Sequence, residues 1–459
     1  MSEALNAAEG GLRKYKSYPA YRNSGVEWLG EIPEHWAIKR LKFAATTIMG
    51  QSPSSDDYTF DEDETPFLQG NAEFGTQYPI ARYFCNTANK IVPTGSILIS
   101  VRAPVGALNI ADRDYGIGRG LCAIVPDSCD LLPEFAWHLL TVTRDELLSI
   151  ATGSTYEAVA ADEVEAMIII LPLLNEQSAI ASFLDRETSK IDALIEKKER
   201  LIELLQEKRS ALITHAVTKG LPAAAAAQAG LDLTVPMKDS GMEWLGEIPE
   251  HWDVKKLKHM SSVQFSSVDK KSYEGEIPVR LCNYVDVYYN DFILPDLNFM
   301  EATASPSEIS KFILRKGDVI ITKDSESWDD IAISAYVPSD FEGVLCGYHL
   351  AQIHSNNAVI DGEYLFRSFS AQGINDQFKV AANGITRYGL GKYWLDNSFF
   401  PTPPTDEQYG ITKFLDLETA KIDALIEKIC QAIECLKEYR TALISAAVTG
   451  KIDVREKTI

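Results

Sequence analysis

Two long segments of the chain repeat hydrophobic residues at alternating steps of three and four positions, with Glu and Lys filling the positions between them. This period predicts two amphipathic helices, each with one narrow apolar stripe. Pro172 and Pro403 stand just before the segments, and Asn175 and Asp406 can cap the helix starts. Each helix runs for about 40 residues, or roughly 60 Å. The predicted stripes consist of Leu184, Ile191, Leu194, Leu201, Leu205 and Leu212, and of Leu415, Ile422, Leu425, Ile429, Leu436 and Leu443.

Two apolar stripes in one chain have to be buried. The simplest arrangement packs the two helices against each other as a coiled coil. The alternative is that each helix lies on its own domain. We favour the coiled coil, because the stripes are narrow and the opposite helix faces are heavily charged.

The chain is also a tandem repeat, in which the helix is one of two repeated parts. The stretch "SGVEWLGEIPEHW" at 24–36 returns as "SGMEWLGEIPEHW" at 240–252, and "KIDALIEK" at 190–197 returns unchanged at 421–428. The segments between opening stretch and helix hardly match. We therefore expect an N-terminal extension at 1–23, a first middle domain at 24–172, a helix at 173–220, a linker at 221–239, a second middle domain at 240–403 and a second helix at 404–455.

Both middle domains are predicted to be mixed α/β. "GSILISV" at 95–101 and "GDVIITK" at 317–323 are short β-rich runs that follow a glycine turn at related places. Segments 132–142 and 362–372 are predicted short helices in matching positions. The expected fold class is therefore α/β (α+β), with two such domains, two long helices and a pseudo-two-fold internal repeat.

The opening stretch is predicted to be an apolar plug that seals the junction between the start of each middle domain and the end of the other half's helix. On this hypothesis, replacing Trp28 or Trp244 by Ala lowers stability or assembly. The first copy of the plug consists of Trp28, Leu29, Ile32, Pro33 and Trp36.

The chain carries 66 acidic and 44 basic residues, a net charge of −22. This balance argues against broad phosphate binding, although net charge does not decide what one face can contact. No apolar run approaches the ~20 residues of a membrane span, and the N-terminus lacks the pattern of a signal peptide. The seven cysteines contain no CxxC pair. We expect a cytoplasmic protein with no membrane contact.

No motif predicts catalysis, a metal site or a cofactor. The sequence has no GxxxxGK[ST] loop and no HExxH spacing. Gly116, Gly118 and Gly120 in "DRDYGIGRG" are preceded by a charged turn and followed by the strand-like "LCAIV", which favours a turn between strands over a nucleotide loop. Pro403-Pro404 lacks the Asn and the aromatic residue of an amino-methyltransferase motif.

The middle domains instead set polar and basic residues among aromatics and glycines. Gln and Asn can bond to adenine, Arg and Lys to guanine, and small hydroxyl groups to phosphates. As a set that occurs in both halves, these residues favour DNA binding. The candidates are Gln69, Asn71, Arg102, Arg119, Ser154, Thr155, Tyr156, Arg280, Asn283, Lys323, Ser325, Thr386, Arg387 and Tyr388.

The paired opening stretches, the repeated helix and the runs "PFLQGN", "ISVRAPVG" and "IGRG" resemble the specificity subunit of Type I restriction-modification systems. The resemblance implies two target-recognition domains, each of which reads half of a bipartite asymmetric site in double-stranded DNA. It implies that two antiparallel helices set the spacer and dock methyltransferase subunits, two of them, with restriction/translocase subunits joining through the complex. It also implies a Gly/Ser/Thr loop near DNA at 153–155, whose second copy at 384–387 departs from it with Ile385.

Two other interpretations remain open. A fused DNA adenine methyltransferase with drifted motifs would bind S-adenosylmethionine or methylate DNA on its own. A coiled-coil scaffold protein would leave the methylated sequence unchanged when residues 37–172 are exchanged.

Overall fold

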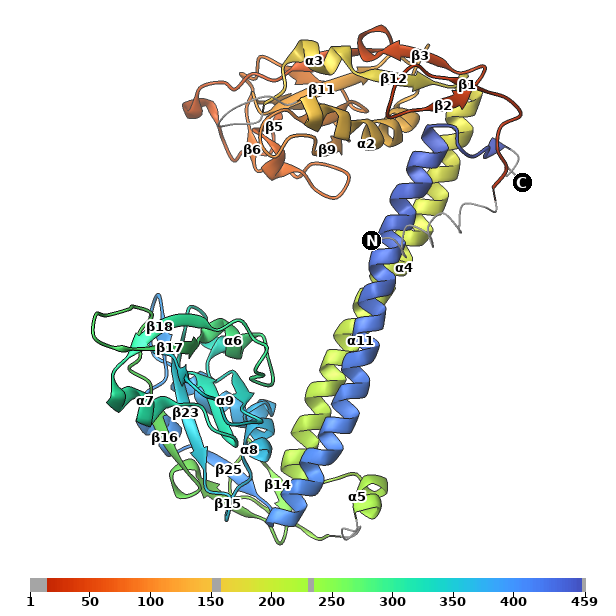
Figure 1. The fold of residues 1–459 in the computed structure, drawn as a ribbon. Helices are drawn as coiled ribbons and strands as arrows, with labels where there is room; N and C mark the ends of the chain where they lie inside the picture. Colours follow the sequence, from red (N-terminus) through yellow and green to blue (C-terminus); the bar gives the residue numbers. More distant parts are fainter. Residues whose placement is uncertain (1–14, 151–157, 230–234, 456–459) are drawn as a thin grey trace. The chain divides into compact units, whose positions relative to one another are not determined.

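The computed structural model describes residues 15–150, 158–229 and 235–455, whose helices and strands are labelled in Figure 1. The chain forms two compact units, one made of residues 1–199 and 430–459 and the other of residues 200–429. Each unit therefore contains one middle domain and one half of each long helix. Within the described ranges, no helix is long and apolar enough to cross a membrane.

The first middle domain is built from two four-stranded sheets and two helices (Figure 1). Its elements are β1 (Tyr21–Asn23), β2 (Glu31–Pro33), β3 (Ala37–Arg40), η1 (Leu41–Phe43), β4 (Ala45–Met49), η2 (Ser55–Asp57), β5 (Pro66–Leu68), η3 (Asn71–Glu73), β6 (Tyr83–Phe84), β7 (Ile91–Val92), β8 (Ile97–Ser100), β9 (Leu108–Ile110), β10 (Tyr115–Ile117), β11 (Leu121–Pro126), α2 (Pro133–Ile150), α3 (Ala161–Ala166) and β12 (Ile168–Leu171). The strand orders are β4-β11-β8-β9 and β6-β5-β10-β7, and β3 pairs with β12, so that the domain begins and ends in one ladder.

The second middle domain has the corresponding sheets, β16-β23-β19-β21 and β18-β17-β22, and the ladder β15-β25. Its elements are β13 (Met237–Asp239), β14 (Glu247–Pro249), β15 (Asp253–Lys256), η4 (Leu257–His259), β16 (Ser261–Phe265), β17 (Ile277–Cys282), α6 (Tyr284–Tyr288), β18 (Met300–Ala304), α7 (Pro306–Phe312), β19 (Asp318–Thr322), β20 (Asp324–Ser325), η5 (Trp328–Asp330), β21 (Ser334–Tyr336), β22 (Val344–Cys346), β23 (Leu350–Ser355), α8 (Gly362–Phe369), α9 (Gln372–Ala381), β24 (Tyr388–Gly389), α10 (Lys392–Asp396) and β25 (Phe399–Thr402). A short helix, α5 (Ala223–Ala229), precedes it.

The predicted strands at 95–101 and 317–323 are the central strands β8 and β19, and every residue of both is buried. Gly95 and Gly317 precede them at φ +85° and +92°, a backbone region that favours glycine. The predicted short helices are α2 and α8. The mixed α/β fold class is confirmed.

The "DRDYGIGRG" segment differs in part from the predicted turn. Tyr115–Ile117 forms strand β10, so the turn itself is limited to the residues from Gly118 to Gly120. A Cβ atom on Gly116 would lie 2.7 Å from the Cβ of Ala88, which explains a glycine inside this strand.

The long helices α4 (Leu174–Lys219) and α11 (Thr405–Val448) pack antiparallel within each unit (Figure 1). In the first unit, Leu184 near the start of α4 shares a core with Leu443 near the end of α11. In the second unit, Ile213 near the end of α4 shares a core with Leu415 near the start of α11. The predicted coiled coil is confirmed.

The seam between the helices follows alternating steps of four and three residues, as a coiled coil requires. Three of the predicted stripe residues are wrong, because Leu194, Leu201 and Leu425 are 43%, 43% and 45% exposed. After Ile191 the seam takes a four-residue step to Ile195, and the three-residue step to Leu194 leaves it. The buried and half-buried seam positions are Leu184, Thr188, Ile191, Ile195, Lys198, Ile202, Leu205, Arg209, Leu212 and Ala216 in α4, and Leu415, Thr419, Ile422, Ile426, Ile429, Ile433, Leu436, Arg440, Leu443 and Ala447 in α11.

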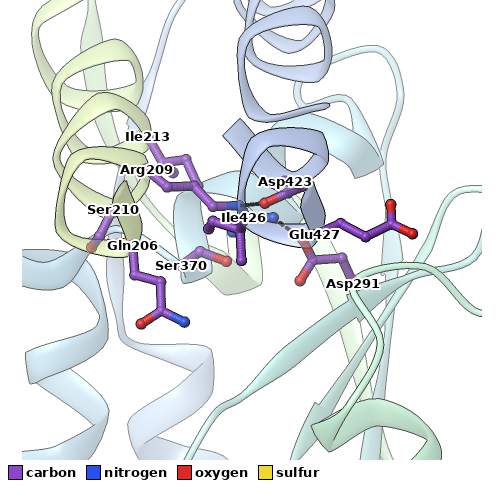
Figure 2. A pocket seen from close by; sticks show the side chains of 9 residues that line it. All are labelled: Gln206, Arg209, Ser210, Ile213, Asp291, Ser370, Asp423, Ile426 and Glu427. Atoms are coloured by element: carbon purple, nitrogen blue, oxygen red, sulfur yellow. Dashed lines mark hydrogen bonds and ion pairs between the residues drawn. The ribbon is translucent and has the colours of Figure 1, made fainter. Parts of the chain in front are cut away.

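Each unit contains one arginine of the seam that pairs with an aspartate of the opposite helix. In the first unit, Arg440 donates to both carboxylate oxygens of Asp192. In the second unit, the Nε atom of Arg209 lies 3.0 Å from Oδ1 of Asp423, and its Nη2 donates to Asp291 of the second middle domain. Figure 2 shows Arg209 reaching both carboxylates across a pocket of about 500 Å³.

The opening stretches lie where the plug hypothesis places them, beside the end of the other half's helix. Lys451, just after α11, donates from Nζ to the carbonyl oxygens of Leu29 and Glu31 at 3.2 and 2.6 Å. Lys219 at the end of α4 donates to the carbonyl oxygen of Leu245 at 3.1 Å.

The identity of the plug residues needs a correction. Trp36 and Trp252 are buried, whereas Trp28 and Trp244 are 39% and 37% exposed. Both exposed rings lie in the same short turn that precedes β2 or β14, outside the packed core of the junction.

Candidate nucleic-acid interface

Three of the candidate residues in the first middle domain line one pocket. Gln69 follows β5, Arg102 follows β8, and Arg119 lies in the turn between β10 and β11. Since β5 and β10 are parallel neighbours, their carboxyl ends reach the same edge of the sheet. The pocket has a volume of about 460 Å³ and is also lined by Ser52, Pro53, Tyr58 and Gly120.

Close backbone packing holds this pocket in place. The amide of Gly118 donates to the carbonyl oxygen of Leu68 at 2.8 Å, and a Cβ atom on Gly118 would lie 2.8 Å from the carbonyl oxygen of Gln69. Glycine at this turn therefore lets the β10–β11 turn approach β5. The amide of Arg119 donates to Oγ of Ser52 at 3.3 Å.

The pocket is rich in hydrogen-bond donors. Arg102 and Arg119 are exposed, and within the described ranges neither guanidinium forms an ion pair. Tyr58 packs its ring 5.2 Å from that of Phe67, and burial raises the pKa of its phenol, which is a hydrogen-bond donor at neutral pH as tyrosines ordinarily are. Two exposed guanidinium groups beside an amide and a phenol suit a ligand that presents acceptors.

The other candidates of the first domain lie apart from this pocket or beyond the described residues. Asn71 begins the short helix η3, two residues after Gln69, and does not line the pocket. Ser154, Thr155 and Tyr156 lie outside the described residues.

Four candidates of the second middle domain gather around the two-stranded ladder of β20 and β24. Ser325 pairs with Tyr388 across the ladder, and Lys323 directly precedes it. Arg387 lies with Nη2 3.6 Å from Oδ1 of Asp324. The structure therefore brings Lys323, Ser325, Arg387 and Tyr388 together at one edge of the domain.

Lys323 lies between two aromatic rings. Its Nζ atom is 4.4 Å from the ring centre of Tyr348 and 5.3 Å from that of Phe265. Burial lowers the pKa of its ammonium group, and Asp324 opposes that effect. The ring faces supply part of the cation's stabilisation here.

Two of the remaining candidates, Asn283 and Arg280, are not free base contacts at this edge, whereas the third, Thr386, directly precedes Arg387. Asn283 is buried, where it starts helix α6 and donates from Nδ2 to the carbonyl oxygen of Leu281. Arg280 lines a separate pocket of about 500 Å³ and donates to the carbonyl oxygen of Glu342. Thr386 is exposed in the segment before β24.

Comparisons with known proteins agree with this architecture. Residues 33–204 match the family model described as the Type I restriction modification DNA specificity domain. The MjaIX specificity subunit of a type I restriction enzyme from Methanocaldococcus jannaschii is 26% identical over 451 residues, which cover 93% of this chain and 96% of that protein. Over nearly its whole length the chain is therefore similar to Type I restriction enzyme specificity subunits.

Other proteins match this chain in part or in fold. The MjaX specificity subunit of the same organism is 37% identical over 198 residues, a match to 42% of this chain and less than half, 46%, of that relative. A solved structure from a study of the assembly of the type I R-M system has a TM-score of 0.63 at 17% identity. It covers 91% of this chain and 98% of the solved chain, and shows likeness of fold alone.

Sequence reasoning missed several side chains of the two candidate sites. Ser52 and Tyr58 line the first pocket. Asp324 accepts a hydrogen bond from Nδ1 of His349 at 2.6 Å, beside Tyr348, in the second domain. Their only sequence signal is proximity to glycines and aromatics, because the strand ends that gather them lie far apart in the chain.

Proposed function

We propose that this chain is the DNA-reading subunit of a Type I restriction-modification complex, in which each middle domain reads one half of an asymmetric bipartite site. One observation carries the proposal. The two middle domains have corresponding strand orders but present different polar side chains at the same strand ends. A duplicated scaffold with divergent contact residues suits two readers of different sequence.

The long helices support a role in setting the distance between half-sites. α4 and α11 are continuous over 46 and 44 residues and share one uninterrupted heptad pattern. A helix pair with this regular seam resists bending. We propose that its length fixes the number of base pairs between the half-sites.

The repeated surfaces support docking of two copies of one methyltransferase subunit. Exposed Trp28 and Trp244 occupy the same place in the two opening stretches, which are nearly identical in sequence. Identical surfaces bind identical partners, and exposed aromatic side chains are common anchors at interfaces. Methylation and cleavage would then reside on partner subunits, with restriction/translocase subunits joining through the complex.

The acidity of the chain is consistent with such an assembly. With a net charge of −22 it gains little affinity from a general attraction to phosphates. Basic surfaces of the partner subunits would supply that affinity, while the pockets of this chain supply discrimination between bases.

The test is a domain exchange. Residues 37–172 are replaced by the corresponding segment of another family member, the chain is produced with its methyltransferase subunits, and modified adenines are mapped in cellular DNA. We expect one half of the recognised sequence to change and the other half and the spacer to stay the same. An unchanged sequence would leave the middle domains without a reading role and would favour a scaffold.

A further inference from the structure

Arg102 and Asp324 occupy the same position in the two middle domains. Both are the second residue after the central strand, β8 or β19. Arg102 forms a β-bridge with Ala158, and Asp324 pairs in the same antiparallel sense with Gly389.

Backbone hydrogen bonds around the preceding residue confirm the correspondence. Val101 donates to the carbonyl oxygen of Gly120 at 2.9 Å, and Lys323 donates to that of His349 at 3.1 Å. In return, the carbonyl oxygen of Val101 accepts from the amide of Val159, as that of Lys323 accepts from Leu390.

The neighbouring strand ends correspond too. Gly118 donates to the carbonyl oxygen of Leu68 just before Gln69, and Gly347 donates to that of Cys282 just before Asn283. Both glycines have no room for a Cβ atom beside this strand end. Arg119 and Tyr348, which follow these glycines, are therefore also equivalent.

The equivalent position has opposite hydrogen-bonding character in the two domains. Arg102 offers an exposed guanidinium that donates only. Asp324 offers a carboxylate that accepts only, with its side chain 20% exposed. His349 and Arg387 approach its Oδ1 atom, and within the described ranges no hydrogen bond or ion pair reaches Oδ2.

We propose that this shared position reads a base edge in the major groove in both domains, with opposite polarity. Arg102 selects a guanine, whose N7 and O6 atoms accept hydrogen bonds, and Asp324 selects a base that presents an exocyclic amino group, cytosine or adenine. The inference rests on the proposed function and assigns the chemistry of one base pair in each half-site.

The experiment uses the full chain in complex with its methyltransferase subunits and a library of DNA duplexes randomised within the recognised site. We expect Arg102→Gln to reduce discrimination at one G·C pair of one half-site by about 5- to 150-fold, and to leave the other half-site unchanged. We expect Asp324→Ala to relax one base pair of the other half-site by a similar factor.

A further variant identifies the base that Asp324 reads. Asn keeps the shape of Asp but adds a donor, and it pairs with the N6 and N7 atoms of adenine. Asp324→Asn therefore keeps the preference if the base is adenine. If the base is cytosine, the amide oxygen still accepts from N4 but the new donor favours adenine, so the preference shifts toward adenine. Asp324→Ala relaxes the preference in both cases.

Matched controls come from the same domains. Arg113 is 65% exposed beside Asp112, and Asp253 is 66% exposed beside Lys255. Arg113→Gln and Asp253→Asn should leave both half-sites unchanged, and thermal melting of every variant complex confirms that it is folded.

Two outcomes would overturn the inference. If Arg102→Gln weakens binding equally for all sequences and reduces the salt dependence, Arg102 contacts a phosphate. If neither Arg102→Gln nor Asp324→Ala changes discrimination, the shared position does not read DNA. Failure of the proposed function looks different, because the wild-type complex itself would then show no sequence preference.

Discussion

Arg440 of α11 donates hydrogen bonds from Nε and Nη2 to the two carboxylate oxygens of Asp192 in α4, at 2.8 and 3.2 Å. Arg209 and Asp423 form an ion pair between the same two helices in the other unit, with Nε of Arg209 3.0 Å from Oδ1 of Asp423. In both pairs the arginine and the aspartate come from different helices, so the antiparallel register brings them together. The pairs therefore report on helix pairing and not on the DNA contacts of either middle domain.

The Arg440–Asp192 pair should contribute a small but measurable coupling energy. Its side chains are 35% and 51% exposed, so water screens much of the attraction. A double-mutant cycle of Arg440→Ala and Asp192→Ala should give about 0.5–1 kcal/mol in denaturant unfolding. The Lys437–Glu434 pair, which lies within one helix on the exposed surface, should give a smaller coupling. A coupling of zero for Arg440 and Asp192 would mean that the register differs in solution.

Loss of Arg209 should cost more than loss of Arg440. Arg209 is 23% exposed and pairs with two carboxylates, Asp423 and Asp291 (Figure 2). Arg209→Ala leaves both carboxylates without their cation, and should lower the free energy of unfolding by about 2 kcal/mol. Arg440→Ala, its equivalent in the other unit, should cost about 1 kcal/mol. Equal losses in denaturant unfolding would show that Asp291 contributes nothing.

The position of the seam can be tested with two neighbouring residues of one helix. Ile191 is buried in the seam, whereas Leu194, three residues later, is 43% exposed. Ile191→Ala should lower the free energy of unfolding by about 2 kcal/mol, because it removes buried methyl groups. Leu194→Ala should change it by no more than about 0.5 kcal/mol. A larger loss of stability from Leu194→Ala than from Ile191→Ala would place Leu194 in the seam, as the apolar stripe of the sequence predicts.

The two tryptophans of the first opening stretch should differ in their contribution to stability. Trp36 is buried between the end of α11 and the first middle domain, and Trp36→Ala should cost about 3–5 kcal/mol. Trp28→Ala should leave unfolding nearly unchanged and weaken binding of the methyltransferase subunit. Calorimetry of the free chain and titration with that subunit measure the two effects. A loss of stability from Trp28→Ala would show that Trp28 is a packing residue of the plug.

One carboxyl group makes a pH-dependent contribution to stability. Burial and the neighbouring Asp416 raise the pKa of Glu363 to about 7, although Arg367 lowers it. A carboxyl with a raised folded-state pKa binds more protons in the folded state than in the unfolded state, so stability falls as pH rises from about 4.5 to about 7. Glu363→Gln should remove this loss and make the chain more stable at pH 8. Its counterpart Glu134, which is exposed, provides the control Glu134→Gln, and identical profiles for both variants would contradict the assignment.

The repeat and its periodicities determined much of the architecture. The repeated residues 190–197 and 421–428 predicted two equivalent helices, and the runs after Gly95 and Gly317 predicted the central strands. Both predictions were possible because these features depend on local spacing and local backbone preference. Gln69, Arg102 and Arg119 were also recognisable as donors by residue type. The sequence did not show that these three residues line one pocket, because the pocket forms only where three strand ends meet in the fold.

The tertiary structure decided the remainder through packing between distant segments. Leu194 and Ile195 are equally apolar in sequence, and only the partner helix selects Ile195 for the seam. Trp28 and Trp36 belong to one repeated stretch, yet Trp36 is buried in the core with the end of α11 and Trp28 is 39% exposed. The correspondence of Arg102 with Asp324 cannot be read from sequences that hardly match, because hydrogen bonds between strands, and not side-chain identity, hold the two positions in the same place.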